Sequence, residues 1–261
     1  MIKNLPAGVI LSVFFFTGFS APTPSGHPND SELYGIRTGL QIPNHGPVVK
    51  IIQPQKNSSY SWDDPIAYAV EVSDKEDGDS KYQEIPSTEV LVKLKYLENA
   101  ARATVYMKQK KFSDTAGIIS MLVSNCFSCH AVKTKLAGPS FQDIAKRYRN
   151  TVTNSRELVN HIKKGSTGVW GKEAMPTHPE LSDTVTWQMV KWILTYSTDH
   201  TLDYFVGLEG TLALNRPGII SRTGIFALSA YYLDHGTTEF PNKRMIGSDW
   251  LTFRVLSKSA K

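Results

Sequence analysis

Cysteine is scarce in this sequence: the 261 residues include only two, and both lie within residues 126–129. A structural zinc site takes four ligands, and no second cysteine pair is present to supply them. The sequence also lacks a phosphate-binding loop, a dinucleotide-binding fingerprint, a catalytic-triad motif and any nucleic-acid-binding motif. After residue 21, no apolar run reaches the roughly 18 residues of a membrane-spanning helix. We therefore expect no zinc module, no nucleotide-dependent enzyme, no nucleic-acid partner and no transmembrane segment in the mature chain.

A mainly apolar stretch lies near the N terminus, from Ala7 to Phe19. It follows Lys3, is too short to cross a bilayer, and ends at the small residues Ser20 and Ala21. This pattern predicts a cleavable secretory signal in residues 1–21. A lipid anchor is not expected, because no cysteine lies near the predicted cleavage site. The polar, proline-rich residues that follow, up to residue 45, are predicted to form a flexible lead-in.

Both cysteines belong to the pentapeptide Cys126-Phe127-Ser128-Cys129-His130. The pattern CxxCH is typical of covalent c-type haem attachment: the two thiols add to the haem vinyl groups, and the adjacent imidazole ligates the iron. A thioredoxin-like redox pair needs a βαβ setting, whereas this motif ends a helical pattern. We therefore predict one covalent haem c on Cys126 and Cys129, with His130 as an iron ligand. Since haem c is attached on the outer side of the membrane, the predicted location is the bacterial periplasm.

Apolar periodicity divides the remainder of the chain into helical and β parts. Apolar residues recur at helical spacing in residues 113–198, with helix starts predicted at Ser113, Ser140, Asn154 and Ser182. Alternating patterns predict strands before and after this part. The predicted segments are a β segment at 46–97, a linker at 98–112, the helical domain at 113–198 and a second β segment at 202–256. The fold class is therefore multidomain, with an all-α domain between β-sandwich-like segments.

The second axial iron ligand is expected from the loop between the last two predicted helices. Met175 lies in this loop, and Pro176 follows it. A lone methionine usually fills a core, but a loop methionine at this point of a CxxCH chain favours a ligand. His178, three residues further on, is the rival and would give a bis-histidine haem of lower potential.

Residues 113–198 resemble a small bacterial class I cytochrome c. The matching elements are Cys126–His130, Gly138-Pro139-Ser140-Phe141, Gly165–Gly171, Ala174-Met175-Pro176 and Leu181-Ser182-Asp183. The resemblance implies that the Pro139 carbonyl accepts the imidazole N–H of His130, which orients the ring. It also implies that Trp170 lies near a haem propionate, although a simple core role is an equal alternative.

The two β segments suggest an immunoglobulin-like or polycystic-kidney-disease-like sandwich, and the sequence leaves open whether they form one unit or two. The order of segments is similar to the C-terminal tails of secreted bacterial sugar-dehydrogenase fusions. In those proteins a β-propeller domain precedes this arrangement, so the resemblance implies either a detached electron-transfer subunit or a remnant that acts alone. The expected partner is a redox protein such as a secreted sugar dehydrogenase or a respiratory oxidase. A loop with Asp74, Glu76, Asp77 and Asp79 could hold Ca²⁺, but a solvated acidic turn is favoured.

The leading functional hypothesis is a single-haem electron carrier and not an enzyme. One alternative is a peroxidase-like haem with a dissociable distal ligand. The other is a carbohydrate- or surface-binding module, for which Tyr231, Tyr232 and Trp250 are candidates, although core roles are favoured. Residues 126–198 contain twice as many basic as acidic residues, which favours an acidic redox protein as partner. The candidate docking residues are Lys133, Lys135, Lys163, Lys164 and Lys172.

Overall fold

The computed structural model describes residues 43–62, 64–108, 115–212, 214, 223–241 and 243–256. The predicted signal segment and nearly all of the predicted lead-in lie outside these residues, as does the predicted helix start at Ser113. Within the described ranges, no helix is both long enough and apolar enough to cross a membrane.

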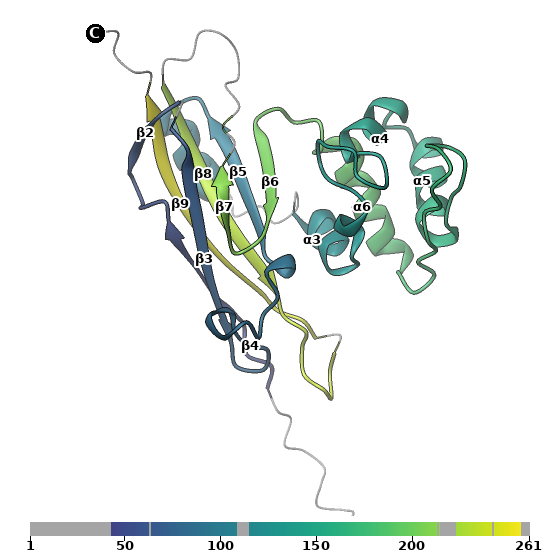
Figure 1. Cartoon of the computed structure of the whole chain (residues 1–261), viewed down its shortest axis with the longest axis horizontal. Coiled ribbons are helices and arrows are strands. Elements are labelled where there is room, and N and C mark those ends of the chain that lie inside the picture. Colours follow the sequence, from purple (N-terminus) through teal and green to yellow (C-terminus); the bar gives the residue numbers. More distant parts are fainter. Residues whose placement is uncertain are drawn as a thin grey trace, which may run out of the picture. The chain divides into compact units, whose positions relative to one another are not determined.

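The β parts form two sheets (Figure 1). The first sheet contains β1 (Val48–Gln53), β3 (Ile66–Asp74), β4 (Gly78–Asp79) and β7 (Glu209–Leu212). The second has the order β2 (Ser59–Ser61), β9 (Ile246–Leu256), β8 (Thr223–Leu233), β5 (Leu91–Leu97) and β6 (Leu202–Val206). Two short 3₁₀ turns, η1 (Ser80–Tyr82) and η2 (Ser87–Glu89), lie between β4 and β5. The strands predicted from Val48, Ile66 and Val90 are thus confirmed to within a residue or two.

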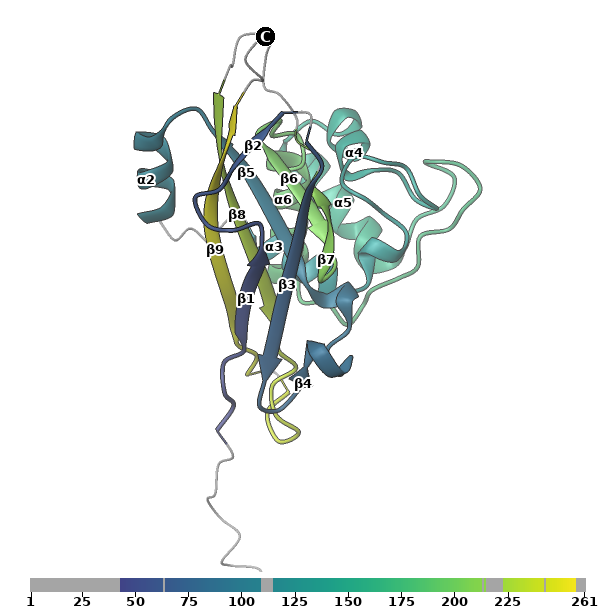
Figure 2. The same ribbon diagram turned by 60° about the vertical axis from the view of Figure 1, so that its left-hand side comes forward.

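Strand pairing joins the β segment that precedes the helical part to the one that follows it. β5 pairs antiparallel with β8 and with β6, so the second sheet takes strands from both segments. The long strands β8 and β9 run side by side in the views of Figures 1 and 2. The two sheets share one core, to which β3 contributes Ile66 and Val72, and β8 and β9 contribute Phe226 and Phe253. The question that the sequence left open is therefore answered: the two segments build one two-sheet unit, and the helical part is inserted between β5 and β6.

The inserted part contains α3 (Ala116–Val123), the 3₁₀ turn η4 (Cys126–Ser128), α4 (Phe141–Arg147), α5 (Val152–Lys164) and α6 (Asp183–Thr195). The helix starts predicted at Ser140 and Ser182 are confirmed, because each hydroxyl accepts a backbone N–H three residues ahead. The start predicted at Asn154 is wrong. Thr151 caps α5, and its hydroxyl accepts the N–H of Asn154 at 3.2 Å. Both residues are good caps, and only the earlier one has the extended backbone that a cap requires.

The segment predicted as a linker contains a helix, α2 (Ala100–Lys108). Ala103 on α2 is buried against Leu97 of β5 and Ala227 of β8. Three of the six apolar residues of α2 are alanines, which give only a weak apolar stripe, and its buried contacts are with β5 and the distant strand β8. This explains why local periodicity did not reveal the helix.

The second sheet also packs against the helices. Leu91 of β5 and Tyr231 of β8 belong to the same apolar core as Ile118 of α3 and Trp192 of α6. The Trp192 and Tyr204 rings meet edge to face, with centroids 5.2 Å apart. Side chains on the outer face of this sheet are therefore part of the helical core.

The acidic turn between β3 and β4 is less solvated than expected. Asp74 is buried and accepts the backbone N–H groups of Glu76 and Asp77, and Asp77 accepts the hydroxyl of Tyr232 at 2.8 Å. Throughout the described residues, no group of three or more histidine, cysteine, aspartate or glutamate side chains is arranged to hold a metal ion. The carboxylates therefore stabilise the turn, and the geometry gives no support to a Ca²⁺ site.

Candidate haem-binding site

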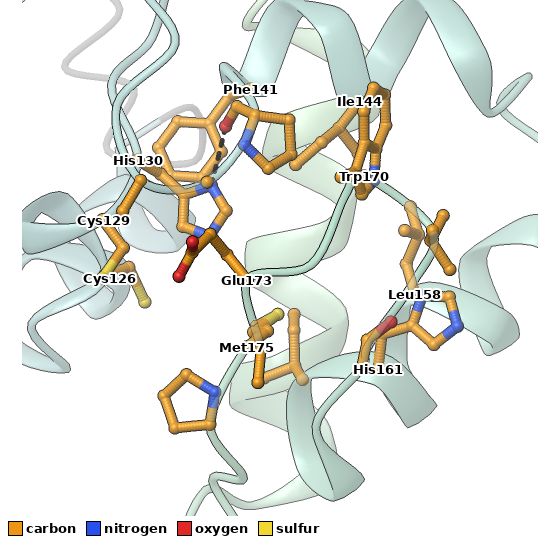
Figure 3. Close-up of a pocket in the computed structure, with 18 of the residues that line it drawn as sticks. Cys126, Cys129, His130, Phe141, Ile144, Leu158, His161, Trp170, Glu173 and Met175 are labelled. Carbon is orange, nitrogen blue, oxygen red and sulfur yellow. Dashed lines mark hydrogen bonds between the residues drawn. The ribbon is translucent and has the colours of Figure 1, made fainter.

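The CxxCH motif forms a compact turn directly after α3. Asn125, with φ of 59°, turns the chain out of the helix into η4. The N–H groups of Cys129 and His130 then donate to the Cys126 carbonyl at 3.2 and 3.0 Å. Both thiols are free and line one pocket together with His130 (Figure 3). Burial raises the pKa of Cys126 to about 11, so the thiol is protonated at neutral pH.

His130 is held in one orientation by a backbone carbonyl. Its Nδ1 lies 2.7 Å from the Pro139 oxygen, which can only accept, so Nδ1 carries the hydrogen and Nε2 keeps its lone pair. The ring stacks on Phe141, with centroids 5.5 Å apart and an interplanar angle of 17°. Burial lowers the pKa of His130, and the bond to Pro139 partly opposes this shift. A neutral imidazole with a free Nε2 is the form that ligates a metal.

Gly138 leaves no room for a side chain beside this ring. A Cβ atom at this position would lie 2.5 Å from Cε1 of His130 and 2.8 Å from its Nδ1. The glycine therefore allows the backbone before Pro139 to lie flat against the imidazole.

We expect Gly138→Ala to displace the His130 ring and to destabilise the protein by about 1–3 kcal/mol, the usual cost of overpacking a core. The measurements are thermal unfolding and the visible spectrum of the haem-loaded protein. Leu136→Ala is the control, since this side chain is in the same loop and is exposed. A Gly138→Ala protein with the spectrum and stability of wild type would contradict the tight contact.

Met175 is placed in the pocket by a short backbone bridge. Its N–H donates to the Ser166 carbonyl at 2.8 Å, and the Ser166 N–H donates to the Met175 carbonyl at 3.2 Å. Gly165 ends α5 with φ of 78°, and a Cβ there would lie 2.8 Å from the Met175 oxygen. The tight turn after α5 therefore fixes the backbone of Met175, and its side chain lines the pocket together with His130 (Figure 3).

His178, the rival ligand, is not part of the pocket lining. Its Nδ1 lies 3.0 Å from a carboxylate oxygen of Glu180, and its backbone N–H donates to the Ile162 carbonyl. A backbone hydrogen bond lowers the pKa of Glu180, and the contact with His178 adds to this shift. Of the two candidate ligands from this loop, the structure brings only Met175 to the pocket.

The remaining pocket walls are mostly apolar and come from all four helices of the insert. The space measures about 1200 Å³, including the part open to solvent. Helical side chains that line it are Met121, Ile144, Leu158, Ile162, Met189 and Ile193. A large apolar cavity with two thiols, an oriented imidazole and a thioether is the donor set that a haem c requires. The residues present therefore fit this cofactor.

Trp170 and two residues that the sequence analysis did not single out complete the rim. Trp170 lines the pocket, is 37% exposed, and has the Arg147 guanidinium 5.0 Å from its ring centroid. His161 on α5 and Glu173 in the Met175 loop also line the pocket (Figure 3). His161 follows the buried Leu158 by three residues, so helical spacing could have placed it on the inner face.

Comparison with known proteins agrees with this site. The family model for cytochrome c matches residues 98–197. Cytochrome c-552 of Nitrosomonas europaea is 42% identical over 72 residues, which cover 28% of this chain and 70% of that protein. Cytochrome c-551 of Pseudomonas aeruginosa is 39% identical over 70 residues, covering 27% of this chain and 66% of that protein. The chain belongs to the cytochrome c family.

A solved structure gives a similar match. The crystal structure of wild-type cytochrome c552 from Nitrosomonas europaea is 39% identical and covers 29% of this chain and 94% of that one, with a TM-score of 0.28. Cytochrome c family members bind one covalent haem c and carry electrons. The matched residues include α2 and the helical insert, whereas the nine strands found in the described residues lie outside them.

Proposed function

We propose that this cytochrome c is a periplasmic single-electron carrier whose haem is attached to Cys126 and Cys129 and ligated by His130 and Met175. The observation that supports this proposal most strongly is that both axial candidates and both thiols line one apolar pocket. Bound haem supplies a one-electron couple between Fe(II) and Fe(III). Export by a signal segment in residues 1–21 is part of the proposal.

The residues around the pocket have separate roles in this proposal. His130 donates Nε2 to the iron, and the Pro139 carbonyl keeps its ring in position through Nδ1. Met175 would supply a sulfur ligand to the iron, and the Ser166 bridge orders its backbone. The apolar helical side chains that line the pocket would limit the access of water to the haem. Trp170 at the rim is proposed to lie near a propionate.

An electron carrier is favoured over the two alternative functions. A peroxidase-like enzyme needs an open coordination position on the iron that a substrate can enter. Here two protein side chains, His130 and Met175, are available to ligate the iron. A carbohydrate-binding β surface is weakened because Tyr231 and Tyr232 are 8% and 1% exposed. Trp250 alone of the three candidates is exposed, and the Lys56 ammonium lies over its ring at 5.4 Å.

Electrochemistry tests the proposal. Wild-type protein made with c-type maturation machinery is expected to show one reversible one-electron wave and no cyanide binding at rest. A resting protein that binds cyanide and turns over peroxide would support the peroxidase-like alternative.

The physiological partner is proposed to be a redox protein, such as a secreted sugar dehydrogenase or a respiratory oxidase.

The lysines proposed for docking differ in how well their charge is compensated. Lys133 pairs with Asp203, and Lys163 pairs with Asp183. Lys135, Lys164 and Lys172 are exposed, and no acidic partner lies within ion-pair distance of them in the described ranges. The latter three are therefore the members of this set whose charge is not compensated by a nearby carboxylate.

We expect electron transfer to ferricyanide, an anionic oxidant, to slow as salt rises from about 10 to 200 mM, because the screening length falls from roughly 30 Å to under 10 Å. Changing Lys135 and Lys172 to Glu should lower the rate at low salt by about tenfold. Stopped-flow spectroscopy measures the rate of electron transfer, and Lys50→Glu on β1 is the control. If all three proteins react alike at every salt concentration, the lysines do not steer anionic partners.

A further inference from the structure

An ion pair connects the second sheet to the haem-attachment loop. The Lys133 ammonium contacts a carboxylate oxygen of Asp203, which lies on β6 opposite Leu94 of β5. The side chain of Asp203 is only 13% exposed, and that of Lys133 is 38% exposed. Partial burial reduces the screening of both charges by solvent.

The backbone position of Lys133 relative to His130 is well fixed. Lys133 follows His130 by three residues, and the loop between them is bonded to α4. Phe141 donates its N–H to the Ala131 carbonyl at 3.0 Å, and Gln142 donates to the Val132 carbonyl at 3.0 Å. At its other end, the loop returns to the imidazole through Gly138. The backbone that carries Lys133 is therefore fixed relative to His130, whose ring lines the haem pocket.

We propose that Asp203 tunes the reduction potential of the haem site by neutralising Lys133. This inference rests on the proposed function, and it assigns a role in electron transfer to a residue outside the part that matches cytochrome c. An uncompensated cation near the iron stabilises the reduced state, which has one positive charge fewer. The β sheet thereby keeps the potential lower than the lysine alone would set it.

A purely structural role for Asp203 makes a different prediction. If the ion pair only anchored β6 to the loop, its removal would lower stability and leave the potential unchanged. Neutralising one partner at a time separates these roles, because the two single variants leave charges of opposite sign between the haem-attachment loop and β6.

The test is spectroelectrochemical titration of the haem-loaded full chain. Asp203→Asn is expected to shift the equilibrium with a reference couple toward the reduced protein by about threefold, or roughly 28 mV, since a tenfold change equals about 59 mV for one electron. Lys133→Gln should shift it by a similar amount in the other direction. The double variant should return close to wild type.

Asp199→Asn is the matched control. Asp199 lies three residues before the start of β6 and pairs with Lys95 of β5, 3.0 Å away. Its substitution therefore removes the same charge without leaving a free cation on the haem-attachment loop. Contacts with Thr201 and Lys95 lower the pKa of Asp199 despite its partial burial, so it is ionised at neutral pH. Its substitution is expected to shift the equilibrium much less than Asp203→Asn.

Equal shifts in Asp203→Asn and Asp199→Asn, or shifts of the same sign in Asp203→Asn and Lys133→Gln, would overturn the inference. If Asp203→Asn does not fold, the lysine variant decides alone, because an unchanged potential in Lys133→Gln would also contradict the tuning role. A wild-type protein without a reversible haem couple would instead contradict the proposed function.

Discussion

Replacing Met175 by alanine is expected to remove the distal sulfur ligand and convert the haem from a closed to an open site. The sulfur-to-iron charge-transfer band should disappear, and the resting protein should bind cyanide and, when reduced, carbon monoxide. The reduction potential should fall on the order of 0.1–0.3 V, within the roughly 0.8 V range that axial ligands control. Visible and near-infrared spectra and a redox titration measure these changes.

His178→Ala is the matched control for this variant. His178 comes from the same loop, and its imidazole contacts Glu180 outside the pocket lining. Its removal should leave the charge-transfer band and the potential close to those of wild type. A low-spin spectrum that survives in Met175→Ala and is lost in His178→Ala would assign the distal position to His178.

Removing the thiols is expected to have the second large effect. Cys126→Ser with Cys129→Ser should abolish covalent attachment entirely, and either single change should leave at most one thioether and a small fraction of matured protein. The reason is geometric, because both thiols line the same pocket on a turn that also places His130. Haem staining after denaturing electrophoresis measures the outcome.

Ser128→Ala controls for changes to the turn itself. The Ser128 hydroxyl contacts the side-chain oxygen of Asn125 at 2.5 Å and lies within the same five-residue motif. Since it adds no bond to the cofactor, its loss should leave attachment intact. Covalent haem in the double serine variant would contradict the assignment of both thioethers.

The candidate haem site was largely predictable because its determinants are local in the sequence. A CxxCH motif, a Gly-Pro pair and a loop methionine can be recognised without knowing the tertiary structure. The contact between Nδ1 of His130 and Pro139 follows an implication of the cytochrome c resemblance, and its length is now 2.7 Å. His161 and Glu173 were missed because neither belongs to a motif; helical spacing could have indicated His161, whereas only the packing of the loop shows that Glu173 lines the pocket.

The fold beyond the haem site was less predictable because it depends on distant pairing. β5 and β8 are both rich in apolar residues, but nothing local indicates that residues about 130 positions apart share a ladder, as Leu94 and Leu228 do. The helix α2 packs against these same strands. Tyr231 is buried because β8 packs against α3 and α6, which is another contact between distant parts of the chain. The pair between Lys133 and Asp203 spans 70 residues and becomes visible only when β6 is placed.

The intact mass of the denatured wild-type protein tests the central claim most directly. The protein should be made with c-type maturation machinery, denatured and extracted with acidified solvent, which removes haem that is not covalently bound. The account predicts a single species whose mass exceeds that of the polypeptide by one haem, with the addition located on the peptide that contains Cys126 and Cys129. A mass equal to that of the polypeptide alone would contradict it.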